Sequence, residues 1–164
     1  MTNDLRIGHG YDVHGFGPGD SVRLGGVTIP HPQGVVAHSD GDVLLHALMD
    51  ALLGAAALGD IGLLFPPGDA RHAGADSRAL LREVVARVAA AGFEVENCDL
   101  TLVAEAPRIG AHREAIRATV AADLGIVRDR VSLKATTVEG LGALGRGEGL
   151  AGHAVVLLRE THDA

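Results

Sequence analysis

The sequence predicts an α/β (α+β) fold in which helices cover one face of a mixed β-sheet. Alternating apolar and polar residues predict strands over residues 5–14, 95–105 and 131–136. β-Branched residues and leucines predict another over residues 153–159, and two short strands around a glycine pair form a hairpin over residues 21–30. Longer segments with helical periodicity lie between these strands, an order typical of layered α and β elements. Six short strands and only three helices leave one sheet face uncovered. We therefore expect another subunit to cover that face.

Local signals support each of the three helices and the hairpin. The first helix is expected over residues 42–58; it is apolar nearly all round, so we expect it to be buried on more than one side. A second helix can be capped by Asp76 or Ser77. A third is expected over about residues 111–124, with a glycine directly after it as the stop. Within residues 21–30, a Gly-Gly pair separates the two short strands.

Composition favours a single folded domain over residues 1–164. Hydrophobic residues make up 47% of the chain and charged residues 21%, a balance that favours a packed core over disorder. The formal net charge is −7 and no basic stripe is present, which argues against a nucleic-acid partner. Aromatic residues amount to only 2%, so stacked rings are not expected to hold a base.

Cysteine content and hydropathy indicate in which cellular compartment the protein is expected. The single Cys98 excludes an internal disulfide framework, and we interpret it as a small buried residue. The N-terminus has no charged segment followed by an apolar one, and no apolar run is long enough to span a bilayer. We therefore expect a cytoplasmic protein without a membrane partner.

A possible metal site combines residues from the first strand and the first helix. Asp12 and His14 are two residues apart in a strand, so their side chains project from the same face. His46 follows in the apolar helix, with Asp42 and Asp50 four residues to either side. Two imidazoles and one carboxylate form a reasonable zinc set with one open position, as in catalytic sites. Asp-x-His pairs are common by chance, so the neighbouring motifs must decide.

Three polar segments could handle phosphates or hydroxyls. Residues 38–42 precede a helix, where an anion could bind, although an ordinary capping loop is an equal alternative. Residues 59–69 form a long loop whose carboxylates lack a nearby basic partner and could accept hydrogen bonds from substrate; the alternative is a solvated turn. Residues 134–139 could meet phosphate oxygens and a hard cation such as Mg²⁺, or simply form a turn.

A glycine-rich segment over residues 140–152 is not a dinucleotide-binding fingerprint, because a strand rather than a helix follows it. In this segment Arg146 could bind an anion or could pair with Glu148, and the spacing does not decide between them. The histidines outside the motifs are expected to be structural or solvated: His9, His31, His72, His112, His153 and His162.

Taken together and in order, these segments closely resemble the 2-C-methyl-D-erythritol 2,4-cyclodiphosphate synthase family. The resemblance extends from about Leu5 to Arg159, nearly the whole chain. The motifs that carry it are Gly10-Tyr-Asp-Val-His14, Ala37-His-Ser-Asp-Gly-Asp-Val-Leu-Leu-His46, Ala57-Leu-Gly-Asp-Ile-Gly62, Gly74-Ala-Asp-Ser77, Lys134-Ala-Thr-Thr137 and Gly145-Arg-Gly-Glu-Gly149.

The resemblance implies a phosphorus–oxygen lyase of non-mevalonate isoprenoid synthesis. Such an enzyme cyclises 4-diphosphocytidyl-2-C-methyl-D-erythritol 2-phosphate to the 2,4-cyclodiphosphate and releases CMP. It also implies a homotrimer with packed sheets, active sites between neighbouring subunits, one Zn²⁺ per subunit, and Mg²⁺ or Mn²⁺ as a second cation.

By the same resemblance, Asp12, His14 and His46 are the zinc ligands, and Glu139 reaches the second cation. His38 and Thr137 are implied to stabilise the transition state. Besides these residues, the implied substrate contacts are Val13, Ser39, Asp60, Ile61, Gly62, Phe65, Pro66, Pro67, Gly68, Asp69, Ala104, Glu105, Ala106, Pro107, Arg108, Ile109, Gly110, Thr136, Val138, Ala143 and Arg146.

Three positions depart from the commoner family pattern. Pro67 stands where an acidic residue is frequent, Val138 replaces a third Thr, and Ala143 stands where an aromatic residue is often found. Ala143 and Arg146 are implied to lie near the trimer axis, where related proteins have a cavity that can hold an isoprenoid diphosphate. Two other functions are compatible with the motifs: a zinc phosphoesterase that yields linear products, and a non-catalytic trimeric module that binds nucleotides or isoprenoid diphosphates.

Overall fold

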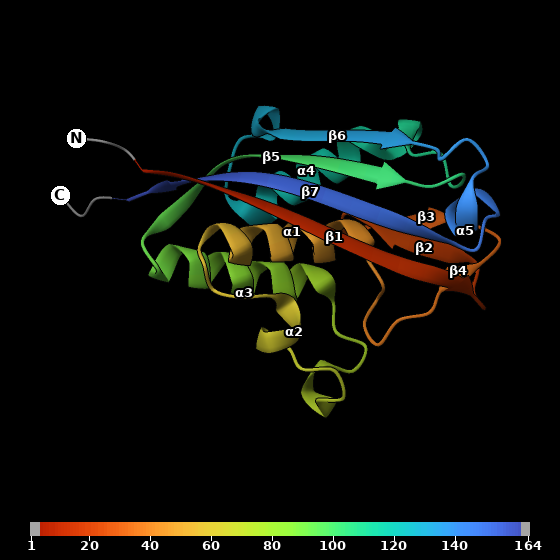
Figure 1. Cartoon of the computed structure of the whole chain (residues 1–164), viewed down its shortest axis with the longest axis horizontal. Helices are drawn as coiled ribbons and strands as arrows, with labels where there is room; N and C mark the ends of the chain where they lie inside the picture. The colour runs from red at the N-terminus through yellow and green to blue at the C-terminus, as the bar shows by residue number, and fades with distance from the viewer. Residues whose placement is uncertain (1–3, 162–164) are drawn as a thin grey trace.

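The computed structural model describes residues 4–161 and contains a five-stranded sheet with helices on one face (Figure 1). The strands are β1 (Leu5–Gly17), β2 (Ser21–Leu24), β3 (Val27–Pro30), β4 (Gly34–Val35), β5 (Phe93–Val103), β6 (Val131–Thr136) and β7 (Gly149–Glu160). The α-helices are α1 (Val43–Ala55), α2 (Ile61–Leu64), α3 (Ser77–Ala90), α4 (Arg113–Leu124) and α5 (Gly142–Gly145). Short 3-10 turns are η1 (Ala70–His72), η2 (Gly110–His112) and η3 (Arg128–Arg130).

The order of strands in the main sheet is β4-β1-β7-β5-β6. Strands β5 and β6 are parallel and the other neighbours are antiparallel, so the prediction of a mixed sheet is confirmed. Strands β2 and β3 form a separate antiparallel hairpin, also as predicted.

Several element boundaries differ from the sequence-based expectation. Helix α1 ends at Ala55 rather than near residue 58, because Ala57 adopts a positive φ of 58° that a helix cannot contain. Strand β7 begins at Gly149, four residues earlier than predicted, because Gly149 pairs with Gly15 of an extended β1. Glycine-rich sequence obscures strand alternation, since glycine has no side chain to report a face.

Helix α1 is the centre of the core, as its apolar sequence predicts. It packs against β1 and β7 on one side and against α3 on another (Figure 1). Leu44, Leu45, Leu48 and Leu52 are fully buried. Each such side chain contributes about 1.5–3 kcal/mol of transfer free energy on burial. This dense packing provides a rigid base for the residues that α1 carries.

Glycines let β1 and β7 approach the backbone of α1 unusually closely. A Cβ atom at Gly8 would lie 1.9 Å from the carbonyl oxygen of Ala51. One at Gly152 of β7 would lie 2.7 Å from the carbonyl oxygen of Val43. The side chains of β1 that follow these contacts are therefore held directly beside the helix.

Asp42 fastens the start of α1 to the β2–β3 hairpin. Its fully buried carboxylate accepts hydrogen bonds from the N–H groups of Leu45 at 3.1 Å, Gly25 at 2.9 Å and Gly26 at 2.7 Å. Burial raises the pKa of this carboxyl, while the three N–H donors act in the opposite direction. Asp42 thus has a structural role as the N-cap, with no free oxygen left for a ligand.

The sheet face opposite the helices exposes apolar side chains. Ile7 is 75% exposed, and Tyr11, Val13 and Val155 lie on the same face of β1 and β7. The prediction that one face lacks helical cover is confirmed. Within residues 4–161, none of the helices has both the length and the hydropathy of a bilayer-spanning segment.

Candidate active site

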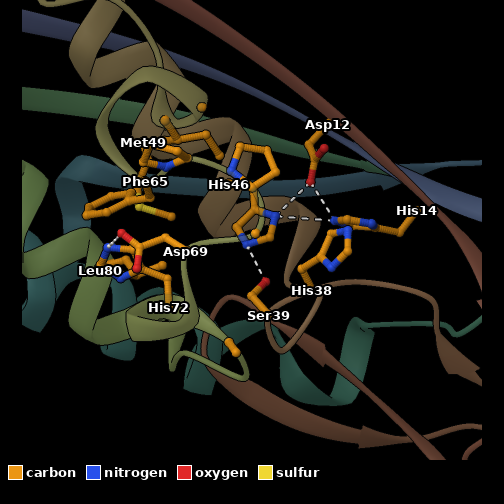
Figure 2. Close-up of a pocket in the computed structure, with 16 residues that line it drawn as sticks. Asp12, His14, His38, Ser39, His46, Met49, Phe65, Asp69, His72 and Leu80 are labelled. Atoms are coloured by element: carbon orange, nitrogen blue, oxygen red, sulfur yellow. Dashed lines mark hydrogen bonds and ion pairs between the residues drawn. The ribbon is translucent and has the colours of Figure 1, made fainter.

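Three metal-ligating side chains meet where β1 lies against α1 (Figure 2). Asp12 and His14 extend from the face of β1 that packs on the helices, opposite to the exposed apolar residues. This common orientation is what strand alternation predicts. His46 lies in the first turn of α1 and points towards both. The structure thus brings together the three residues that the sequence singles out.

The three ligand atoms form a small triangle. Asp12 Oδ2 lies 2.9 Å from His14 Nε2 and 2.9 Å from His46 Nδ1, and the two ring nitrogens are 3.2 Å apart. Ligands about 2 Å from a tetrahedral zinc ion are separated by roughly 3.3 Å. One ion therefore fits among these atoms with little movement, and three protein ligands leave a fourth position open.

The electrostatics of the cluster suit a cation. Burial disfavours ionisation of Asp12, but hydrogen bonds and charges from His14 and His46 outweigh it and lower the pKa of this carboxyl to about 2. The hydrogen bond to Asp12 raises the pKa of His14, burial opposes this, and a hydrogen bond to the backbone of Val36 adds to the rise. A carboxylate that stays ionised and favours positive charge beside it is what a metal ion requires.

The cluster opens into a cavity of about 330 Å³ (Figure 2). The predicted site residues that line it are Asp12, His14, His38, Ser39, His46, Ile61, Gly62, Phe65, Pro66, Pro67, Gly68 and Asp69. Sequence analysis missed four further lining residues, Met49, His72, Ala73 and Leu80. The cavity therefore joins a polar metal-ligating end to an apolar wall.

His72, which we expected to be structural or solvated, packs against a neighbouring aromatic ring. Its ring packs edge-on against Phe65 at 5.1 Å between centroids, on the cavity wall. No local pattern marks this residue, because the loop that carries it is brought to the cavity only by the packing of α1 and α3. His162, for which the same expectation was made, lies outside the described residues.

Asp60 and Val13, two of the predicted substrate contacts, do not line the cavity. Asp60 Oδ1 accepts a hydrogen bond from Leu63 N–H at 2.8 Å and caps α2. The side chain of Val13 is 47% exposed on the opposite face of β1, as the period of the strand requires.

Asp69 lines the cavity, but the expectation that it lacks a basic partner is wrong. The guanidinium of Arg71 pairs with it at 2.6 Å. Hydrogen bonds from Arg71 lower the pKa of the Asp69 carboxyl to about 2. This carboxylate is therefore ionised over the whole physiological range of pH.

A second cavity, of about 250 Å³, lies at the ends of β5 and β6. Predicted site residues that line it are Ala104, Glu105, Pro107, Arg108, Ile109, Gly110, Thr136 and Thr137. Ala135 and Arg113 also line it, and the sequence analysis did not identify them. Ala106 precedes a cis peptide bond to Pro107 and is not on the cavity wall.

Glu105 holds the loop that follows β6. Its Oε1 atom accepts hydrogen bonds from the N–H groups of Val138 at 3.0 Å and Gly140 at 3.4 Å. Within this loop, Glu139 has a positive φ of 54° and its N–H donates to Thr137 Oγ1 at 3.2 Å. The side chain of Glu139 is exposed and lies outside the cavity wall.

The remaining predicted residues lie at the exposed end of the sheet. In the isolated chain Arg146 pairs with Glu148 at 2.9 Å, which is one of the two alternatives that the sequence left open, the other being an anion site. Ala143, in α5, is exposed and lines neither cavity. Lys134, in β6, lines neither cavity and pairs with Asp99.

The two cavities share no residue and lie at different parts of the sheet. The first adjoins β1 and the second adjoins the ends of β5 and β6, with β7 between β1 and β5 (Figure 1). Two to three strand spacings correspond to roughly 10–14 Å. Within one chain, a small ligand therefore meets either the metal-ligating cluster or the second cavity.

Comparison with known proteins agrees with this arrangement. Residues 5–159 match the YgbB family. The chain is 65% identical to 2-C-methyl-D-erythritol 2,4-cyclodiphosphate synthase of Pseudomonas aeruginosa over 94% of this chain and 98% of that protein. A solved structure of a synthase of this name with bound CDP is 43% identical, with a TM-score of 0.86 over 93% of this chain and 99% of that one.

The bifunctional IspDF protein of Campylobacter jejuni is 42% identical, with a TM-score of 0.93. The match covers 97% of this chain, which spans only 43% of that longer protein. The match over residues 5–159, the identity of 65% and the shared fold lead to one conclusion: the chain belongs to the YgbB family, the family of the 2-C-methyl-D-erythritol 2,4-cyclodiphosphate synthases.

Proposed function

We propose that the Asp12–His14–His46 cluster holds a zinc ion and that the protein uses it in the reaction of its family. The protein is a phosphorus–oxygen lyase of the non-mevalonate pathway. It cyclises 4-diphosphocytidyl-2-C-methyl-D-erythritol 2-phosphate to 2-C-methyl-D-erythritol 2,4-cyclodiphosphate and releases CMP. The observation that carries the zinc assignment is the triangle of three ligand atoms, 2.9–3.2 Å apart, at one end of a cavity.

The reaction needs alignment and charge neutralisation more than it needs a base. The second pKa of a phosphate monoester is about 6, so the 2-phosphate is already a nucleophile near neutral pH. One of its oxygens forms a bond to the terminal phosphorus of the diphosphate. The bond from that phosphorus to the oxygen of CMP breaks, and CMP leaves with the electron pair. The obstacle is repulsion between the phosphates.

The metal-ligating end of the first cavity addresses this obstacle. A bound zinc ion would act as a Lewis acid towards a diphosphate oxygen. Asp12, His14 and His46 would hold it with the fourth position facing the cavity. His38 lies beside His14 on the same wall (Figure 2), where its ring would stabilise charge on the phosphate in the transition state. Ser39 would add a hydroxyl donor to the same phosphate.

The loop after α1 would hold the methylerythritol part. Ile61, Gly62 and the segment from Phe65 to Asp69 enclose the cavity and would exclude water from the reacting phosphates. Asp60 uses Oδ1 to cap α2, which leaves Oδ2 to accept a hydrogen bond from a substrate hydroxyl. Val13 would contribute through its backbone, since its side chain faces away.

The second cavity would bind the cytidine diphosphate part. The segment from Ala104 to Gly110 would recognise cytosine largely through backbone groups. Thr136 lines the cavity, but its hydroxyl donates to the carbonyl oxygen of Thr137 at 3.0 Å and would have to turn to contact the diphosphate. Thr137 lines the cavity too and would donate its hydroxyl hydrogen to the diphosphate. Thr137 Oγ1 already accepts from Glu139 N–H, so its own hydrogen is free to stabilise the transition state. Glu139, with Val138 beside it, would meet Mg²⁺ or Mn²⁺ through its exposed carboxylate, a usual mode for a cation that also binds phosphate.

A homotrimer with active sites between subunits would unite the two halves. One chain separates its two cavities by two to three strand spacings, roughly 10–14 Å of sheet. The second cavity of one subunit placed against the metal end of a neighbour would serve one substrate. The exposed Ile7, Tyr11 and Val155 support packing of this sheet face against other subunits. An isoprenoid diphosphate near Ala143 would need Arg146 to leave Glu148.

Phosphorus NMR of the protein with substrate and Mg²⁺, before and after zinc removal, tests the proposal. Cyclic diphosphate and CMP that form only in the presence of zinc are the expected result. Linear products would instead identify a zinc phosphoesterase in which water attacks. Unchanged substrate would identify a binding module, and cyclisation that persists without zinc would overturn the metal assignment.

A further inference from the structure

We propose that Asp40 and Ser77 form a hydrogen-bonded chain that orients His46, so that Nδ1 rather than Nε2 of its ring faces the metal position. The inference rests on the proposed function, because it concerns how a zinc ligand is held. Ser77 is the first residue of α3 and is fully buried, and Asp40 lies in the loop before α1. Neither lines the cavity, so both are positioning residues.

The chain of contacts is continuous from the carboxylate to the imidazole. The hydroxyl of Ser77 donates to Asp40 Oδ1, and the N–H of Ser77 donates to Oδ2 at 3.0 Å. On its other side, Ser77 Oγ lies 3.0 Å from His46 Nε2. A third donor, the N–H of Asp42, reaches Asp40 Oδ1 at 3.2 Å. Asp40 therefore joins the start of α1 to the start of α3 around the His46 ring.

Counting hydrogens gives the direction of each bond in the chain. An ionised carboxylate can only accept, so the single hydroxyl hydrogen of Ser77 is committed to Asp40. The Ser77 oxygen must then accept from His46, which requires a hydrogen on Nε2. A neutral imidazole has one N–H, so Nδ1 of His46 keeps its lone pair. Nδ1 is the atom that lies 2.9 Å from Asp12 Oδ2, where a metal ligand must present a lone pair.

Ser39 does not replace Ser77 in this role. Its Oγ atom lies 3.1 Å from His46 Nε2 (Figure 2), nearly as close as that of Ser77. However, Ser39 is only half-buried, it lines the cavity, and no carboxylate fixes the direction of its hydrogen. Its hydroxyl can turn towards substrate. The buried Ser77 has a fixed polarity and therefore determines the tautomer of His46.

Zinc affinity is the readout that separates orientation of His46 from general support of the fold. Partners in the outer shell of a metal site typically contribute roughly 10- to 100-fold in metal affinity. We expect Ser77→Ala, which removes only the hydroxyl, to weaken zinc binding by about tenfold or more in competition with a chromophoric chelator. We expect Asp40→Asn to have a similar effect, because an amide can donate to Ser77 and reverse the chain.

Asp76→Ala is the matched control for support of helix α3. Asp76 caps the same helix by accepting from Arg78 N–H at 3.0 Å, but it does not contact His46. This variant should lose stability while it keeps wild-type zinc affinity. Imidazole ¹H–¹⁵N NMR of the zinc-loaded wild type provides a second measurement, in which His46 should carry its hydrogen on Nε2.

The outcomes separate failure of the chain from failure of the proposed function. If Ser77→Ala and Asp40→Asn bind zinc with affinities within twofold of wild type, the proposed hydrogen-bonded chain is overturned, whereas the zinc site itself is not. A zinc-loaded His46 with its hydrogen on Nδ1 would have the same meaning. Wild-type protein that binds no zinc, or binds it equally well after His14→Ala, would overturn the metal site and the chain together. If Ser77→Ala does not fold, the zinc affinity of the nearly isosteric Asp40→Asn and the NMR spectrum of the wild type still test whether the hydrogen-bonded chain orients His46.

Discussion

Gly10 lies directly against the carbonyl oxygen of Ala47: a Cβ atom at residue 10 would come within 1.7 Å of that oxygen. The contact brings β1 onto α1 beside His46 and two residues before Asp12. It thereby brings together the side chains of Asp12 and His46, which are 34 residues apart in the sequence. The geometry of the metal-ligating cluster depends on residue 10 having no side chain.

Gly10→Ala should therefore damage both stability and metal binding. Forcing a methyl group against backbone typically costs about 1–3 kcal/mol, and β1 must move away from α1 to relieve the contact. Urea unfolding and zinc titration measure the two effects. Gly54→Ala is the control, because Gly54 is an exposed residue of α1 with nothing within 4 Å of an added Cβ. It should stabilise the protein by about 0.5–1 kcal/mol. Unchanged stability and zinc affinity in Gly10→Ala would contradict the argument.

Asp42→Ala should destabilise the protein without a direct effect on ligands. The change leaves the N–H groups of Leu45, Gly25 and Gly26 without their acceptor. Unsatisfied buried donors cost about 1–3 kcal/mol each, so we expect a loss of about 3 kcal/mol or more in the free energy of unfolding. Asp76→Ala removes an exposed cap and should cost only about 1 kcal/mol. Equal losses in the two variants would refute the special role of Asp42.

Zinc removal should abolish activity and leave the fold largely intact. The core around α1 is complete without an ion, and the ligand triangle is already formed. Lewis-acid stabilisation is worth several kcal/mol, so turnover should fall by at least about 100-fold. Circular dichroism before and after chelation tests the fold, and added zinc should restore turnover. Zinc-free protein that has lost its helical signal would show that the ion organises the fold instead.

Arg71→Gln should raise the pKa of the Asp69 carboxyl towards the ordinary value of an aspartate, about 3.9. In the wild type, hydrogen bonds from Arg71 hold this pKa at about 2, so the ion pair is present above pH 4 and is lost as the pH falls towards 2. Carboxyl ¹³C NMR over pH 1.5–6 follows the titration of Asp69 directly. A variant in which the carboxyl still titrates near pH 2 would show that another group holds it ionised.

Ile7→Lys should prevent assembly of the proposed trimer. Ile7 is 75% exposed on the open sheet face of a single chain, where a lysine is tolerated, but a packed interface would bury its charge. Sedimentation should show monomers, and turnover should fall because the two cavities then stay on separate molecules. Val127→Lys is the control, since Val127 is 64% exposed but belongs to the turn between α4 and η3 and not to β1 or β7. A fully assembled Ile7→Lys protein would exclude this face as the interface.

Local periodicity determines much of the candidate site. The alternation of β1 places Asp12 and His14 on one face, and the apolar run of α1 shows that His46 lies on a buried helix. Asp76, one of the two caps expected for α3, likewise accepts from a helix N–H group at the start of that helix. These features follow from the sequence because each depends only on neighbours within one turn or one strand.

Tertiary packing decides the rest, because it acts between residues that no local pattern connects. His72, Leu80 and Met49 reach the cavity only when α3 and the loop before it fold back on α1. The partners of His46 show the same division. The local sequence places Ser77 at a helix start, whereas only the fold brings its hydroxyl oxygen to 3.0 Å from Nε2 of His46, 31 residues earlier. The spacing of residues along the sequence shows on which face of a strand or helix a side chain lies. Which of these faces pack together is determined by the close approach of β1 and β7 to α1, which their glycines allow.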